Sequence, residues 1–138
     1  MNFTLHSRLA ADTEPVGDLE LCRVLILKDA RYPWLVLTPR IDGLVELDDL
    51  GPDDLVQLMQ ESALATRVMR GLSGVEKVNV GVLGNIVRQL HVHVVGRRAG
   101  DYAWSGPVWG AGQANAYEPA ELAARRAWFA ARLKINPE

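Results

Sequence analysis

The chain lacks the features that mark secreted or membrane-spanning proteins. It has a single cysteine, Cys22, so it has no internal disulfide, and a reducing compartment is its natural setting. Its apolar runs fall well short of the ~20 residues that a membrane-spanning helix needs. Residues 1–15 contain no apolar signal core, because charged side chains interrupt them. These absences predict a cytoplasmic protein without a membrane segment, in which Cys22 is a small buried hydrophobic residue.

The chain also lacks a strong excess of either charge. Fifteen Lys and Arg residues stand against 17 Asp and Glu residues, which gives a formal net charge of −2 and no reason to expect nucleic-acid binding. Hydrophobic residues make up 49% of the 138 residues, which is typical of a globular protein with one substantial core. Because no repeat or low-complexity tract is present, we expect one domain over residues 1–138. Its core should span 19–98, and a C-terminal loop and helix should span 99–138.

The hydrophobic pattern predicts an α+β fold. Short runs rich in Val, Leu and Ile, separated by turn residues, predict strands at residues 19–28, 34–38, 75–83 and 89–97. The first two strands should form a hairpin, and so should the last two. Within such a hairpin, Asn79 would lie beside the strand at 89–97.

Two longer segments have helical spacing. The main helix is expected at 52–70, with proline at its first position, and a second helix follows Pro119 at 120–133. A short helical turn is expected at 5–11. The loop at 98–117 is rich in Gly, Trp and Pro, and we expect buried aromatic side chains to pin it. Closure over a site or packing across a dimer interface is the alternative for this loop.

The run from Gln89 to Arg97 carries the most informative residues. Side chains alternate between the faces of a strand, so Gln89, His91 and His93 should share one face, with the two histidines about 7 Å apart along the strand. A neutral imidazole is a good nucleophile when its other nitrogen donates to a group such as a backbone carbonyl. A second imidazole, if protonated, would donate to a phosphoryl oxygen and add positive charge. The pair therefore suits attack on a phosphate.

Two other interpretations of the pair stay open. A strand can carry two histidines on a solvated face without any function, and periodicity alone does not separate this case from a site. A His-x-His spacing also suits a metal, but a metal needs a third ligand. Only His6 and carboxylates such as Asp29 and Asp101 remain to provide one. We therefore expect neither a metal nor a cofactor.

The segment Gln89-Leu90-His91-Val92-His93-Val94-Val95 resembles the signature of the histidine triad family of nucleotide hydrolases and transferases, His-φ-His-φ-His-φ-φ with φ apolar. The spacing and all apolar positions match, as do Asn79-x-Gly81 and the hairpin at 25–40. The resemblance covers residues 19–98. It implies an antiparallel sheet of about five strands with helices packed on it. It also implies a homodimer that forms through the main helix and one strand.

The resemblance implies a catalytic set. His91 matches the nucleophile, which would form a nucleotidyl-histidine intermediate on the α-phosphate of a nucleoside monophosphate derivative. His93 matches the histidine that contacts the phosphate, and Gln89 would orient the site. The implied activity is that of a nucleotide phosphoramidase or a related hydrolase.

The resemblance also implies a binding set for a purine nucleotide or a nucleotide conjugate. Asp29 would accept hydrogen bonds from the ribose hydroxyls. Asn79 would lie near the α-phosphate, and Leu27 and Val36 would wall the base pocket. Asn85 stands where many relatives carry glutamine, although from the residues alone it is interpreted as a turn residue.

Besides Asn85, the sequence departs from the family pattern at three places. Gln89 replaces the first histidine and cannot titrate near neutrality. Trp34 stands where many relatives carry a histidine, and Ile86 where many carry Ser or Thr. A bacterial-type branch of the family shares the glutamine and a Pro-Trp pair like Pro33-Trp34. Three hypotheses follow: an enzyme, a nucleotide-binding module with little or no catalysis, and a His-x-His metalloprotein.

Overall fold

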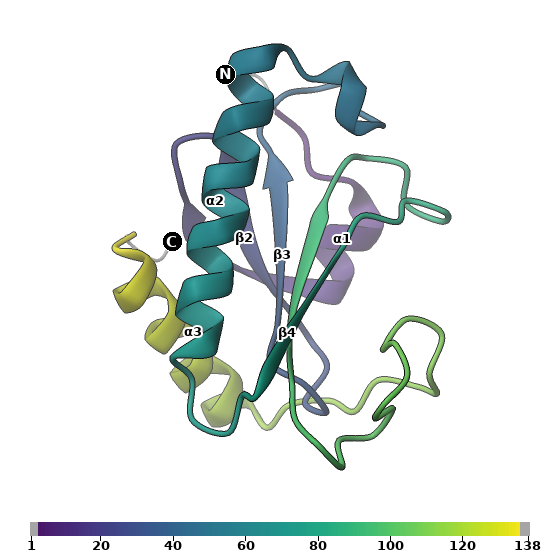
Figure 1. Cartoon of the computed structure of the whole chain (residues 1–138), viewed down its shortest axis with the longest axis vertical. Coiled ribbons are helices and arrows are strands. Elements are labelled where there is room, and N and C mark those ends of the chain that lie inside the picture. The colour runs from purple at the N-terminus through teal and green to yellow at the C-terminus, as the bar shows by residue number, and fades with distance from the viewer. Residues whose placement is uncertain (1–2, 136–138) are drawn as a thin grey trace.

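A five-stranded antiparallel sheet with the strand order β1-β2-β3-β5-β4 organises the fold (Figure 1). The structure is a computed structural model that describes residues 3–135. The strands are β1 (Thr13–Asp18), β2 (Cys22–Leu27), β3 (Trp34–Pro39), β4 (Lys77–Gly81) and β5 (Val92–Arg97). The helices are α1 (Ser7–Asp12), α2 (Pro52–Arg70) and α3 (Pro119–Leu133), with a 3₁₀ turn, η1, at Leu47–Asp49. The predicted α+β fold is confirmed.

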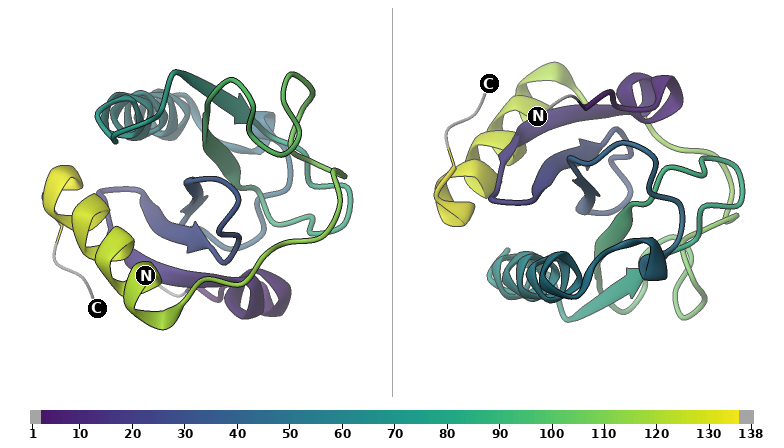
Figure 2. Two further views of the ribbon diagram at one scale, coloured as in Figure 1. Left: turned by 90° about the horizontal axis from the view of Figure 1, so that it is seen from below. Right: turned by 90° about the horizontal axis from the view of Figure 1, so that it is seen from above.

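The sheet separates two different environments. Helices α2 and α3 cover one face, whereas α1 and the C-terminal loop lie on the opposite side (Figure 2). Alternation along the strands divides their side chains accordingly. Leu35 and Val94 join Leu58 of α2 and Phe129 of α3 in an apolar core. On the other face, Trp34, Val36 and Val95 pack with Leu9 of α1 and Val108 of the C-terminal loop.

Strand β1 is the element that the sequence pattern misses. Its six residues include Pro15 and Gly17, which are poor strand formers. The structure accommodates them because β1 lies at the sheet edge, and its register with β2 shifts between these two residues. An edge strand with a bulge tolerates a residue that has no amide donor.

The histidine strand is shorter than predicted. Strand β5 begins at Val92 instead of Gln89, because the amide of Leu90 donates to the carbonyl of Leu44 rather than to a neighbouring strand. The predicted hairpin with β4 is present, and it places Gly81 directly opposite His93. His91 therefore belongs to the segment that leads into the strand.

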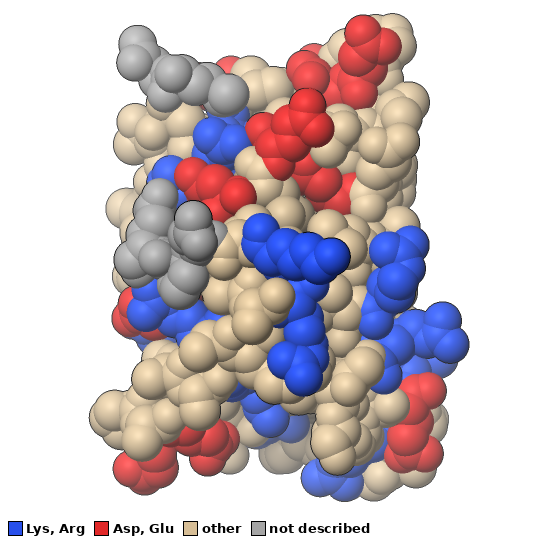
Figure 3. All heavy atoms as spheres, turned by 90° about the vertical axis from the view of Figure 1, so that its left-hand side faces the viewer, with Lys and Arg blue, Asp and Glu red and all other residues tan. Residues whose placement is uncertain are grey.

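Charge is distributed unevenly over the outer surface of α2 and α3. Figure 3 shows acidic side chains gathered mainly toward the upper end of this face and basic side chains across its middle and lower parts. Along α2, Asp53 and Asp54 occupy the first turn and Arg67 and Arg70 the last turn. This order complements the helix dipole. None of the helices within residues 3–135 is long and apolar enough to cross a membrane.

Candidate active site

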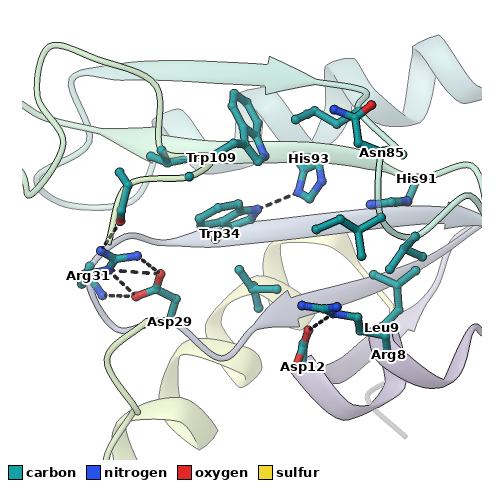
Figure 4. A pocket seen from close by; sticks show the side chains of 18 of the residues that line it. Arg8, Leu9, Asp12, Asp29, Arg31, Trp34, Asn85, His91, His93 and Trp109 are labelled. Carbon is teal, nitrogen blue, oxygen red and sulfur yellow. Dashed lines mark hydrogen bonds and ion pairs between the residues drawn. The ribbon is translucent and has the colours of Figure 1, made fainter. Parts of the chain in front are cut away.

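A cavity of about 560 Å³ opens on the face of the sheet opposite α2 and α3 (Figure 4). Its size falls in the range of small-molecule sites. The cavity brings together several residues that the sequence singles out: Leu27, Asp29, Asn85, His91 and His93.

His91 is held with one ring nitrogen facing the backbone. Its Nδ1 lies 2.6 Å from the carbonyl oxygen of Gln89, and because a carbonyl can only accept, Nδ1 carries the hydrogen. In the neutral ring, Nε2 then keeps its lone pair. The pKa of His91 is lowered, mainly because burial disfavours the charged form, although the bond to Gln89 opposes this effect. The structure therefore presents the arrangement that a nucleophilic imidazole needs.

His93 is held differently. The indole Nε1 of Trp34 donates to Nδ1 of His93 across 2.9 Å, and both side chains are buried (Figure 4). Burial, and in second place the charge of His91, lowers the pKa of His93 to about 3. The sequence interpretation considers a protonated imidazole at this position. The structure instead presents a neutral imidazole, because burial disfavours its charged form and its Nδ1 already accepts the N–H of Trp34.

The two imidazoles lie closer together than the strand spacing predicts. Their ring centroids are 4.8 Å apart with the planes inclined by 68°. The expected spacing of about 7 Å assumes that both residues belong to one extended strand. Because His91 precedes the first residue of β5, its ring leans toward that of His93. Both rings can therefore address one small group in the cavity.

Asp29 lies at the cavity wall, but other residues of the chain already occupy its carboxylate oxygens as hydrogen-bond donors. Its carboxylate accepts from Nε and Nη2 of Arg31, at 3.0 and 2.9 Å, and from the backbone N–H of Asn115 at 3.3 Å. Arg31 in turn donates from Nη1 to the carbonyl of Ala111 at 2.6 Å. Asp29 and Arg31 therefore join the β2–β3 hairpin to the C-terminal loop. Sequence reasoning missed Arg31, whose partner lies 80 residues further along the chain.

Gln89 does not line the cavity. Its side-chain oxygen accepts from the backbone N–H of His6 at 2.8 Å, and its side-chain nitrogen donates to the carbonyl of Thr4 at 2.9 Å. The side chain thus joins the N-terminal segment to the start of the histidine strand. Gln89 reaches His91 only through its own backbone carbonyl.

Asn79 and Val36 also lie outside the cavity lining. The side-chain oxygen of Asn79 accepts from Nη1 of Arg97 at 2.8 Å, and Arg97 is further bound by the carboxylate of Asp101. Val36 is fully buried directly opposite His93 in the β3–β5 pairing. Val36 therefore lies beside His93 on the neighbouring strand. Asn79 is bound to Arg97 instead of facing the cavity.

The C-terminal loop supplies a wall that sequence reasoning treats mainly as structural. Val108 and Trp109 line the cavity, so the loop closes against the site. Trp109 stands edge-on to His93, with ring centroids 5.6 Å apart. Gly81 permits this approach, because a Cβ there would lie 2.7 Å from the Trp109 ring. Nothing in the local sequence around Trp109 reveals this contact.

The metal hypothesis gains no support from the geometry. Within residues 3–135, His, Cys, Asp and Glu side chains do not gather in groups of three or more that could hold a metal ion. The histidine pair instead has a carbonyl and an indole as its partners.

An antiparallel sheet that presents two buried histidines to a cavity is the arrangement of a histidine triad fold. A family profile, the HIT domain, matches residues 8–100, and the chain belongs to the histidine triad (HIT) family. The matched segment ends before Trp109 and the other C-terminal loop residues that line the cavity.

Solved structures extend the similarity over nearly the whole chain. A histidine triad protein from Bradyrhizobium japonicum is 43% identical, with a TM-score of 0.92, and the match covers 95% of this chain and 98% of that one. One from Sinorhizobium meliloti is 45% identical, with a TM-score of 0.89 and 96% and 95% covered. One from Marinobacter aquaeolei is 41% identical, with a TM-score of 0.92 and 96% of each chain covered. No curated protein matches the sequence.

Proposed function

We propose that this protein is a nucleotide-binding hydrolase or transferase that acts on the α-phosphate of a nucleoside monophosphate derivative through His91. One observation carries the proposal: the bond from Nδ1 of His91 to the carbonyl of Gln89 leaves the Nε2 lone pair free for attack. The lowered pKa of His91 keeps this lone pair available at neutral pH.

The proposed reaction has two steps. Nε2 of His91 forms a bond to the α-phosphorus while the bond between phosphorus and the leaving group breaks, and the leaving group takes a proton from solvent. Water, or another acceptor, then attacks the nucleotidyl-histidine, the bond from nitrogen to phosphorus breaks, and the acceptor's proton goes to solvent. Ile86, which is 73% exposed at the cavity, has no group that donates a proton. A leaving amine must therefore take its proton from solvent.

The cavity has an apolar part that suits the base of a nucleotide and a polar part that suits its phosphate. Leu9 of α1 and Leu27 of β2 line the cavity and suit the flat face of a purine base. Asn85 lines the cavity too, where its amide can donate to a phosphate oxygen. A hypothetical histidine triad nucleotide-binding protein from Sulfolobus tokodaii has the same fold at 13% identity with a TM-score of 0.67.

The test is release of AMP from an adenosine phosphoramidate by the native protein and by His91→Ala. We expect release that disappears in the variant, together with a nucleotide adduct on His91 that can be trapped in acid-quenched native protein. His6→Ala is the histidine control: it removes an exposed imidazole that caps α1 by accepting from the N–H of Arg8, and it leaves His91 in place. Release that persists in His91→Ala would overturn the assignment of the nucleophile.

A binding module without catalysis is the second candidate. It is favoured by Gln89, whose side chain is engaged by Thr4 and His6 instead of reaching the cavity. Calorimetry with AMP separates the two functions. Affinity for AMP without any His91-dependent release from several activated nucleotides would establish the module and reject the enzyme.

We also propose that the protein forms a homodimer through α2 and β4. The outer edge of β4 has no partner strand within residues 3–135. Exposed apolar side chains lie on α2, on β4 and directly after β4: Val56, Met59, Val80 and Val82. Light scattering should report twice the mass of the chain, and Met59→Glu should convert the dimer to a monomer.

The single buried thiol, Cys22, is consistent with a cytoplasmic location.

A further inference from the structure

We propose that Trp34 is a positioning residue that fixes His93 as its Nε2–H tautomer. The Nε2–H group of the neutral ring then donates a hydrogen bond to a phosphoryl oxygen of the ligand. The role in the reaction rests on the proposed function, whereas the tautomer does not. Trp34 stands where many relatives carry a histidine.

The hydrogen bond between the two side chains determines the tautomer. An indole N–H can only donate, so Nδ1 of His93, 2.9 Å from Nε1 of Trp34, has to be the acceptor. A neutral imidazole whose Nδ1 accepts carries its hydrogen on Nε2. His93 lines the cavity, and within residues 3–135 its Nε2 has no hydrogen-bond partner. The Nε2–H group is therefore available to a ligand oxygen.

The surroundings make the tautomer hard to change. Trp34 is 5% and His93 9% exposed, so water does not replace a lost hydrogen bond. A proton on Nδ1 would turn two N–H groups toward each other, and each would lose its buried partner. The sheet register keeps the pair together: Val36 lies opposite His93, and Trp34 is two residues away on the same face of β3.

The two histidines thereby receive opposite tautomers from opposite partners. The carbonyl of Gln89 accepts from Nδ1 of His91, which leaves Nε2 as a lone pair. The indole of Trp34 donates to Nδ1 of His93, which leaves Nε2 as a donor. The rings are identical in chemistry and only 4.8 Å apart at their centroids. Their partners alone assign attack to His91 and stabilisation to His93.

Trp109 provides a matched control within the same site. It flanks His93 edge-on with ring centroids 5.6 Å apart, against 5.7 Å for Trp34. Its buried indole nitrogen has no hydrogen-bond partner among the described residues. Trp109→Phe therefore removes an indole beside His93 without removing a hydrogen bond, whereas Trp34→Phe removes both.

The decisive experiment is ¹⁵N NMR of histidine-labelled, ligand-free protein from pH 5 to 8. We expect His93 to show a protonated Nε2 and an unprotonated Nδ1 over this whole range in the native protein and in Trp109→Phe. In Trp34→Phe, His93 should show mixed tautomers and titrate at a higher pH than in the native protein, because the N–H that opposes protonation of Nδ1 is gone. A protonated Nδ1 in the native protein, or an unchanged spectrum in Trp34→Phe, would overturn the proposal. The native spectrum decides the tautomer even if Trp34→Phe does not fold.

The pH profile of AMP release tests the role in catalysis. Trp34→Phe should lose about tenfold in kcat/KM at pH 7, since its phosphoryl donor is only partly present, and the acid limb of its profile should move to higher pH. Trp109→Phe should keep the shape of the native profile. Equal profiles for both variants would overturn the positioning role. If the native protein shows the Nε2–H tautomer but releases no AMP, the proposed function fails while the tautomer assignment stands.

Discussion

The two faces of the sheet follow different rules. The face under α2 and α3 is an apolar core whose members recur at regular strand or helix spacing within each element, such as Leu58 on α2 and Phe129 on α3. The opposite face is lined by aromatic and polar side chains, and each of its key contacts joins distant parts of the chain. Trp34 and His93 are 59 residues apart, and Arg31 and Ala111 are 80 apart. Stability is concentrated on the first face and chemistry on the second.

The largest effect should come from the helical face. Phe129→Ala removes a fully buried side chain and should cost about 3–5 kcal/mol of unfolding free energy, measured by urea denaturation. AMP affinity of the folded protein should stay within a factor of two or three, because Phe129 lies on the side of the sheet away from the cavity. A tenfold loss of affinity in the folded variant would show that the two faces are coupled.

A smaller loss of stability is expected from the other face. Asp29→Asn leaves Arg31 with one side-chain oxygen at position 29 instead of two and removes the negative charge, which should cost about 2–3 kcal/mol. Because Arg31 also holds the carbonyl of Ala111, the C-terminal loop should loosen. Hydrogen exchange of residues 108–115 should rise in the variant. Unchanged exchange there would contradict the role of Asp29 as an anchor of this loop.

The smallest effect is a loss of unfolding free energy at acidic pH that comes from His93, on the cavity face of the sheet. His93 has a pKa of about 3 in the folded protein against about 6.5 when unfolded, so below pH 6.5 the unfolded chain binds the extra proton. Stability from this residue is present above pH 6.5 and falls as the pH drops, by about 2 kcal/mol at pH 5. Urea titrations at pH 7 and pH 5 measure this loss. His93→Gln should lose about 2 kcal/mol less than the native protein over the same interval. Equal losses in both proteins would show that His93 does not carry the burial penalty.

Local patterns predict the helical face well. The spacing of apolar residues and Pro52 predict α2 over the residues that it occupies, 52–70. The start of α3 at Pro119 and the pairing of β4 with β5 are predicted on the same grounds. These features depend on residues close in sequence, where helical spacing and turn chemistry act directly.

The site is predicted only in part. The histidine pair is visible as a motif, and the need of His91 for a carbonyl partner follows from imidazole chemistry. The commitment of Asp29 to Arg31 and the approach of Trp109 to His93 depend on where the C-terminal loop returns. No periodicity encodes such a return. Trp34 is visible as a departure from the family pattern, but its hydrogen bond to His93 requires the register of β3 and β5.

Gln89 has a practical consequence for work with the protein. The backbone carbonyl of Gln89 orients His91, and the side chain of Gln89 is hydrogen-bonded to the backbone of Thr4 and His6. Both of these partners precede residue 8, where the family match starts. A chain trimmed to the family boundaries would therefore lose this support of His91 while keeping every motif residue.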